Sequence, residues 1–145
     1  MEQVRRAVLP AMTKRHPVAA WVVDDTGFPK KGKHSVGVTR RYCGRIGKQD
    51  NCRVAVSVSV ATWYASLPIA WRLYLPETWA KDSERRRKAG VPGKVRFQTK
   101  PRIALNQIRQ AVDKQIPGDL PRLEITSGGI EPDCSLDRLG RQVSA

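Results

Sequence analysis

The sequence lacks any long hydrophobic run and any export signal of the usual kind. No stretch of about 18 consecutive apolar residues occurs, so no segment is expected to cross a bilayer. The first twenty residues contain several cations and two prolines, and they contain no apolar core of the kind that a secretory signal requires. These absences predict a cytoplasmic protein without a membrane span.

Acidic residues are also scarce. The 145 residues include 13 Asp and Glu against 27 Lys and Arg, which gives a net charge of +14. Such a charge favours a polyanionic partner, because each phosphate that a cation neutralises releases counterions. Composition alone does not choose between nucleic acid and an anionic membrane surface.

Cysteine is present only at Cys43, Cys52 and Cys134, with no spacing typical of a zinc or redox site. We therefore interpret the three residues as reduced thiols that pack as small apolar groups.

With 40% apolar residues, the chain can bury the core of one ordinary domain. The run Val18 to Asp24 is short, apolar and rich in β-branched residues, so it predicts a buried strand that ends on Asp24 and Asp25. The glycine, proline and lysines of Thr26 to Lys33 predict a loop. A short strand is expected near Val36 to Val38.

The clearest pattern is the alternation of valine with small residues from Arg53 to Ala61, which predicts a strand with one apolar face. Leu67 to Leu75 is expected to return beside it, so that the two segments form an antiparallel hairpin. Four aromatic residues in or beside this hairpin are interpreted as core rather than as base-stacking platforms. They are Trp63, Trp71, Tyr74 and Trp79.

Two helices are expected after Pro76. Asp82 or Ser83 caps a charged segment that runs to Ala89. Its run Arg85 to Lys88 is interpreted as a solvated helix face, with contact to a DNA backbone as the alternative.

The second helix spans Lys100 to Gln115, with Thr99 as its cap and with Leu105, Ile108 and Val112 on one face. Beyond Pro117 the periodicity is lost and only Arg122 to Thr126 suggests a strand.

The tripeptide Asp24-Asp25-Thr26 is the strongest candidate for chemistry. Carboxylates at the end of a buried strand can coordinate a hard cation through oxygen, although the same residues are also common in turns. Lys30, Lys31 and Lys33 lie just downstream and add capacity to bind phosphate.

Several long motifs then occur in a recognisable order. They are DDTGFPKKGKHSVGV from Asp24, RYCGRIGKQDNCRV from Arg41, LPIAWRLYLPETW from Leu67, ERRRKAGVP from Glu84 and FQTKPRIALNQI from Phe97. Together they resemble one branch of the DDE-type insertion-sequence transposases, from about Ala20 to about Ala111.

The resemblance implies an α/β, ribonuclease-H-like fold and an enzyme that cuts DNA with two Mg²⁺ ions held by acidic residues. The first of these acids would be Asp25, because related transposases place it directly before Thr, and Asp24 stays open as the alternative. DNA is the implied partner. The basic residues expected to contact it flank the first strand, and they are Lys30, Lys31, Lys33, Arg40, Arg41, Arg45 and Lys48.

The chain departs from the family after the helix that ends near Val112. No motif like Asp-Ala-x-Tyr-Gly follows, and the region that would carry the catalytic Glu is absent. Asp113, Asp119 and Glu124 are interpreted as solvated carboxylates. The expected organisation is a lead-in over 1–17, a partial catalytic domain over 18–116 and a divergent, poorly ordered tail over 117–145.

An incomplete ribonuclease-H-like sheet would expose an edge and an apolar face. The sequence therefore predicts a truncated transposase without nuclease activity of its own. Two alternatives stay open. One is a remnant that binds DNA without sequence preference, and the other is a fragment that associates with itself or with intact transposase and inhibits it.

Overall fold

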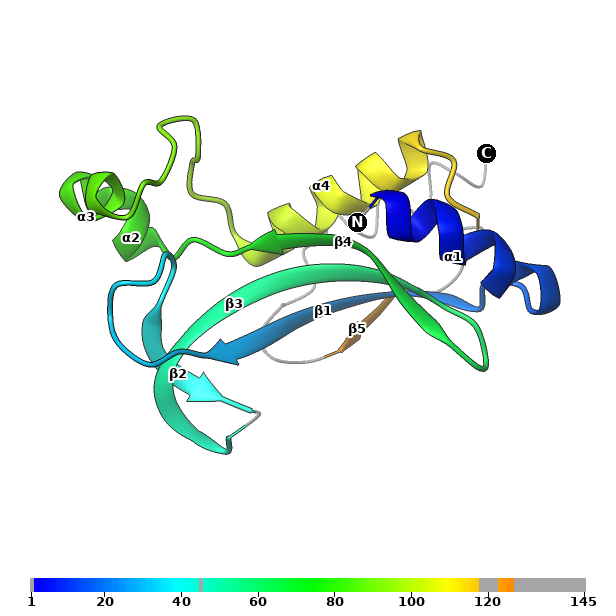
Figure 1. The fold of residues 1–145 in the computed structure, drawn as a ribbon, viewed down its shortest axis with the longest axis horizontal. Coiled ribbons are helices and arrows are strands. Elements are labelled where there is room, and N and C mark those ends of the chain that lie inside the picture. The colour runs from blue at the N-terminus through cyan, green and yellow to red at the C-terminus, as the bar shows by residue number, and fades with distance from the viewer. Residues whose placement is uncertain (1, 45, 118–122, 127–145) are drawn as a thin grey trace.

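The protein is an α/β chain in which helices lie over a mixed sheet (Figure 1). The computed structural model describes residues 2–44, 46–117 and 123–126. In chain order the elements are α1 (Glu2–Arg15), β1 (Ala20–Pro29), β2 (Thr39–Cys43), β3 (Lys48–Ala61), β4 (Ser66–Leu73), α2 (Glu77–Lys81), α3 (Ser83–Lys88), α4 (Lys100–Asp113) and β5 (Leu123–Thr126). Within the described part, no helix has the length and apolarity needed to span a membrane.

Strand β1 lies inside the sheet, between β3 and β5. It pairs antiparallel with β3 over its whole length, from Ala20 opposite Ala61 to Pro29 opposite Cys52. It pairs parallel with β5, where Asp24 is in register with Thr126. The long β3 also pairs antiparallel with β2 at its start and with β4 over the rest. Trp21 to Asp24 therefore have a paired strand on both sides, whereas Asp25 to Pro29 pair with β3 alone among the described strands.

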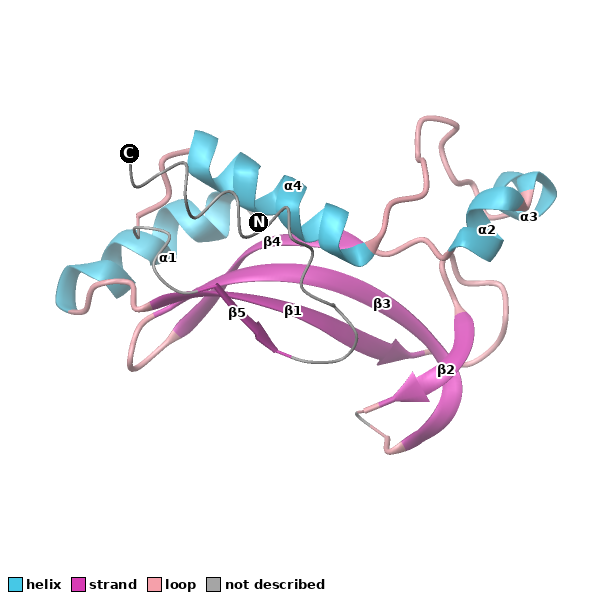
Figure 2. Cartoon of the chain, turned by 180° about the vertical axis from the view of Figure 1, so that it is seen from behind, coloured by secondary structure: helices cyan, strands magenta, loops and turns pink. Residues whose placement is uncertain are grey.

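The main core lies between one face of the sheet and the helices α1 and α4, which cover the same face (Figures 1 and 2). Alternation along β1 and β3 directs every second side chain to this face. The sheet contributes Trp21, Val23, Val56, Val58 and Val60, and α4 contributes Ile103, Ala104, Ile108 and Ala111. The valine pattern of the sequence is thus the inner surface of the sheet.

Helix α4 begins as the sequence predicts. The Thr99 hydroxyl accepts a hydrogen bond from the Arg102 amide at 3.4 Å, and Pro101 occupies the first turn. The expected apolar face is wrong at Val112, which is 41% exposed. Leu105 and Ile108 are buried as expected, and Ala104 and Ala111 complete the buried surface of the helix in place of Val112.

A second, smaller core holds the segment after β1 against α2 and α3. It is built on Val38, Leu75 and Trp79, and the Trp79 indole Nε1 donates a hydrogen bond to the Val38 carbonyl at 2.8 Å. The Arg85 guanidinium lies 3.9 Å from the centre of the Trp79 ring and also donates to the Lys33 carbonyl at 3.1 Å. This core fixes the course of the chain from residue 33 to residue 38.

The hairpin of β3 and β4, the helix after Asp82 and the strand within Arg122 to Thr126 are confirmed. The loop expected over Thr26 to Lys33 is wrong in its first part, because β1 continues to Pro29. The strand expected near Val36 to Val38 is also wrong, since that segment turns and β2 follows it. The 14-residue β3 supplies backbone partners to β1 as far as Pro29 and to β2 only from Thr39 onward, which sets where each strand ends or begins.

The aromatic residues divide between core and surface. Trp79 is fully buried, as predicted, and Tyr74 is half-buried. The interpretation of Trp63 and Trp71 as core is wrong, since they are 83% and 43% exposed. Trp63 lies in the turn between β3 and β4, and Trp71 lies on β4, which pairs only with β3 among the described strands.

Cys43 and Cys52 are buried free thiols, which confirms the interpretation made for them. Burial raises the pKa of the Cys52 thiol to about 11, and a hydrogen bond with Cys43 adds to the rise. Cys134 and the tail segment 127–145 lie outside the described residues.

Candidate functional site

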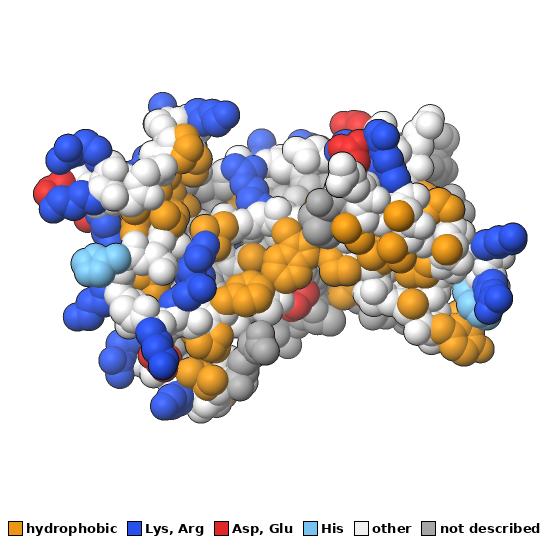
Figure 3. Space-filling model, in the orientation of Figure 1, with side chains coloured by type: hydrophobic (Ala, Val, Ile, Leu, Met, Phe, Trp, Pro, Cys, Tyr) orange, Lys and Arg blue, Asp and Glu red, His pale blue; other side chains and the backbone are white. Residues whose placement is uncertain are grey.

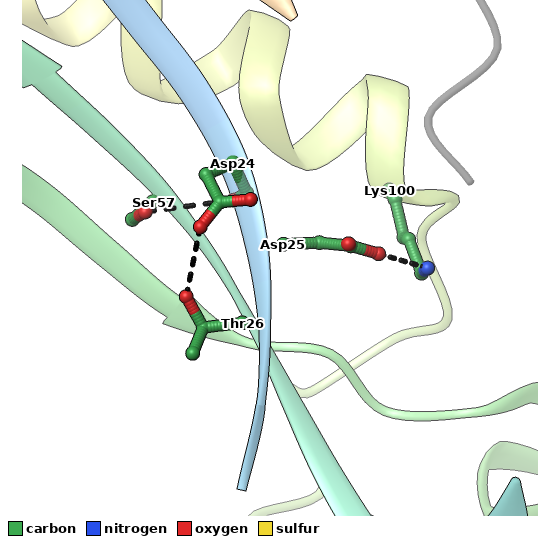
Figure 4. Close-up of polar contacts among 5 residues, drawn as sticks. All are labelled: Asp24, Asp25, Thr26, Ser57 and Lys100. Carbon is green, nitrogen blue, oxygen red and sulfur yellow. Dashed lines mark hydrogen bonds and ion pairs between the residues drawn. The ribbon is translucent and has the colours of Figure 1, made fainter. Parts of the chain in front are cut away.

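Asp25 lies in the middle of β1, where its residue pairs with Val56 of β3. It follows Trp21 and Val23 in the alternation, so its side chain points to the face that α4 covers. Its carboxylate forms an ion pair with the Lys100 ammonium at the start of α4 (Figure 4). The two side chains are only 6% and 10% exposed, which makes this a buried pair. The expectation that the strand ends on its carboxylates, open to solvent, is wrong.

Asp24 points to the opposite side of β1, as Figure 4 shows. Its Oδ2 accepts a hydrogen bond from the Thr26 hydroxyl at 3.0 Å, and its carbonyl accepts a 3.5 Å bond from the Ser57 hydroxyl. The two neighbouring carboxylates therefore do not converge on one position, and they differ in partner and in environment.

The described residues do not fit a two-cation centre. No group of three or more His, Cys, Asp or Glu side chains comes together among residues 2–44, 46–117 and 123–126. Asp113 is exposed at the end of α4, and Glu124 is in register with Val22 rather than with Asp25. Asp119 lies outside the described residues. The nearest positive charge to Asp25 in this arrangement is the Lys100 ammonium, which already neutralises it.

The basic residues expected to contact DNA lie on two segments, the loop after β1 and the hairpin of β2 and β3. Most of them are exposed: Lys30, Lys31, Lys33, Arg40 and Lys48. Arg41 is half-buried, and Arg45 is not described. Lys30 and Asn51 join the two segments, because the Lys30 amide donates to the Asn51 carbonyl at 2.8 Å. Lys and Arg side chains gather over the end of the molecule that holds β2, α2 and α3 (Figure 3).

The charge run of α3 is half-buried at Arg85 and Arg86 and exposed at Arg87 and Lys88. Arg86 donates to the carbonyls of Ala80, Pro92 and Val95, and it thereby holds the loop after α3. Lys88 pairs with Glu84 at 2.7 Å. Because Arg85 and Arg86 are half-buried and hydrogen-bonded, interpreting the run as a solvated face is wrong for these two residues.

Lys100 is the residue of this site that the sequence did not reveal. Its position in the sequence could have indicated it. A lysine in the first turn of a helix opposes the helix dipole and needs a compensating anion. The anion is Asp25, 75 residues earlier in the chain.

The fold and the site thus define an α/β protein that carries a buried carboxylate on an inner strand and a basic surface at one end. The family model described as DDE superfamily endonuclease matches residues 1–120. The chain belongs to this family of DDE-type transposases and endonucleases.

A curated relative is the probable transposase for insertion sequence element IS701 from Microchaete diplosiphon. It is 30% identical over 110 residues, which are 76% of this chain and 26% of that protein. The chain thus spans about a quarter of the length of the curated relative that it matches. No solved structure matches the chain.

Proposed function

We propose that this chain supplies the part of a DDE transposase catalytic domain that carries the first catalytic carboxylate, Asp25, and that its partner is DNA. The family match carries the proposal. The DDE family implies a divalent metal, typically Mg²⁺, and Asp25 would be one of its ligands.

The two faces of β1 favour Asp25 over Asp24. Asp25 lies on the inner face beside the first turn of α4, where its buried side chain is held by the Lys100 ammonium. Asp24 is held by the hydroxyl of its near neighbour Thr26 on the outer face. A catalytic carboxylate works best when a rigid element and a second side chain both hold it, and Asp25 has β1 and the Lys100 ammonium for this.

The order of elements supports the ribonuclease-H-like architecture expected from the resemblance. A first strand is followed by an antiparallel hairpin and helices, and β5 then returns parallel to β1. The partial catalytic domain expected over 18–116 holds every described element of this arrangement except α1 and β5.

We further propose that these 145 residues do not cleave DNA alone. Two-metal cleavage needs several acidic ligands around one position, and the described residues bring one buried carboxylate there. No Asp-Ala-x-Tyr-Gly-like motif follows α4 in the sequence. The exposed lysines after β1 favour a second role in which the chain binds DNA without cutting it.

The test is a cleavage and binding assay on DNA that carries the ends of the parent element, with Mg²⁺ or Mn²⁺. We expect binding without nicking or strand transfer. Asp25→Asn is the active-site variant, and Asp24→Asn is the matched control on the next residue of the same strand. Cleavage that Asp25→Asn abolishes and Asp24→Asn retains would show that a working site assembles, which would contradict the inactivity and support the assignment of Asp25.

A further inference from the structure

A groove of about 370 Å³ crosses β1, β3 and β4, and Lys30 is the residue that it shares with the basic surface described above. Three cations border it, Lys30, Arg53 and Arg72, and two aromatic rings lie in it, Phe28 and Trp71. Its volume is in the range of pockets that take small organic groups, roughly 300–1,000 Å³.

The strand register places Phe28, Arg53 and Trp71 on the face opposite α1 and α4. Phe28 pairs with Arg53, and Ser57 pairs with Trp71, so these side chains alternate with the valines of the inner face. Arg72 is in register with Val56 and borders the groove from β4. Within the described part of the chain, α1 and α4 both cover the other face (Figure 2). The groove is therefore open over a rigid sheet.

The aromatic pair of Phe28 and Trp71 leaves one ring face free for stacking. The rings of Phe28 and Trp71 lie 5.7 Å apart at 44°, so each already supports the other and no third ring fits between them. Trp71 keeps 43% of its surface exposed. A flat apolar group can therefore stack on its outer side without any rearrangement of the sheet.

The charges around the pair select an anionic ligand. Among the described residues that line the groove there is no carboxylate. Asp24 lies on the same face, in register with Ser57 and Trp71, and its Oδ2 accepts the Thr26 hydroxyl. A symmetric contact with a second copy would oppose the three cations with three identical ones, which disfavours self-association through this face.

We propose that the groove binds single-stranded or unpaired nucleic acid, with one unstacked base on Trp71 and the adjoining phosphates on Lys30, Arg53 and Arg72. Exposed aromatic rings beside cations are how proteins hold single strands without reading sequence. The inference rests on the proposed function in one respect, since DNA is the partner in both. It adds a base-binding surface on the sheet face away from Asp25.

The experiment compares a twelve-nucleotide oligo-dT with an abasic strand of the same length and charge, by fluorescence anisotropy at fixed salt. We expect the wild-type chain to bind oligo-dT more tightly than the abasic strand. Trp71→Ala should weaken oligo-dT binding roughly fivefold to a hundredfold and leave abasic binding unchanged, as for one stacked base. Trp71→Phe should retain most of the affinity, and Trp63→Ala, at the exposed hairpin turn, is the matched control.

Equal binding of oligo-dT by Trp71→Ala and Trp63→Ala would overturn the proposal, as would equal wild-type affinity for the two strands. Self-association that Trp71→Ala removes would also overturn it, in favour of a second copy. Circular dichroism establishes whether each variant is folded. If Trp71→Ala does not fold, the comparison of Trp71→Phe with the wild-type chain replaces it. Binding of duplex DNA by the wild-type chain is measured in parallel. If the wild-type chain does not bind duplex DNA, the proposed function is contradicted rather than this inference.

Discussion

The pair of Asp25 and Lys100 joins the middle of the central strand to the start of α4. Moving both charges out of water costs several kcal/mol, and their mutual attraction offsets this only while both are present. Lys100 thus has a structural effect that is separable from any part Asp25 has in DNA cleavage. The pair also holds the second acid of the DDTG motif on the inner face of the sheet.

Removing one charge of this pair should destabilise the fold. We expect Lys100→Met to lower the free energy of unfolding by roughly 3–5 kcal/mol, because it leaves the Asp25 carboxylate buried and unpaired. The double variant Asp25→Asn with Lys100→Met should recover much of that loss. Urea denaturation of the two single variants and the double variant measures the coupling.

Lys81→Met is the control for this cycle, since it removes a lysine from an exposed pair with Glu77 in which the lysine side chain is 75% exposed. Such a pair contributes only about 0.3–0.5 kcal/mol. Equal effects of Lys81→Met and Lys100→Met would contradict the buried pair.

Cys52 should be chemically inert in the folded protein. Burial and then the hydrogen bond with Cys43 raise its pKa from 9.0 to about 11. The reactive thiolate is therefore depleted at pH 8.5, and we expect slow alkylation by iodoacetamide until urea unfolds the chain. Peptide mass spectrometry follows the peptide that contains Cys52, and rapid native labelling of it would contradict the prediction.

The same shift gives a pH dependence of stability. Between pH 9.0 and about 11 the unfolded thiol has lost its proton and the folded thiol has kept it. The contribution of Cys52 to stability is therefore complete below pH 9 and declines as the pH rises through this window. Thermal melts of Cys52→Ala should show a shallower decline over the same range than those of the wild-type chain.

At the scale of elements, α2, α3 and the loop after them form a unit around Trp79 and Arg86. Arg86 donates three hydrogen bonds to backbone carbonyls of this unit, whereas the adjacent Arg87 is exposed. Of four consecutive basic residues, the fold thus places some in hydrogen bonds within the protein and leaves others exposed to solvent.

We expect Arg86→Met to destabilise this unit by about 1–3 kcal/mol, since it removes hydrogen bonds to the part-buried carbonyls of Ala80 and Val95. Arg87→Met should change stability by less than about 0.5 kcal/mol. Hydrogen exchange at residues 89–96 localises the effect. Equal protection in the two variants would show that Arg86 is not what holds the loop.

At the scale of the whole molecule, the charge of +14 should govern DNA binding. Affinity for duplex DNA should fall steeply with salt and ignore sequence, because phosphate neutralisation releases counterions. Changing Lys30, Lys31 and Lys33 to Gln should reduce the slope of log K against log salt by roughly 3 if all three contact phosphate. A filter-binding or anisotropy titration over salt measures it.

The matched control changes Lys14, Arg109 and Lys114 to Gln, three exposed cations on α1, on α4 and just after α4. Both triple variants remove the same charge, so only location differs between them. The same slope in both would show that the loop after β1 is not the DNA-binding surface.

The sequence by itself determined the period-two valine strand, its hairpin partner, the capped helix after Thr99 and the family. These features depend on neighbours in the chain or on long motifs, so they are readable without a fold. It also pointed to Asp24 and Asp25 as the residues to examine, and it predicted the strongly basic surface.

Only the tertiary structure decided what each of those residues does. Pairing with β3 extends β1 beyond the two carboxylates. Because side chains alternate along a pleated strand, Asp24 and Asp25 then lie on opposite faces of the sheet. The tertiary structure also brought Lys100 to Asp25 across 75 residues, and it exposed Trp71, which lies on a strand with one described partner. Strand length, strand register and the contact between Lys100 and Asp25 depend on pairing between distant segments, which no local sequence pattern specifies.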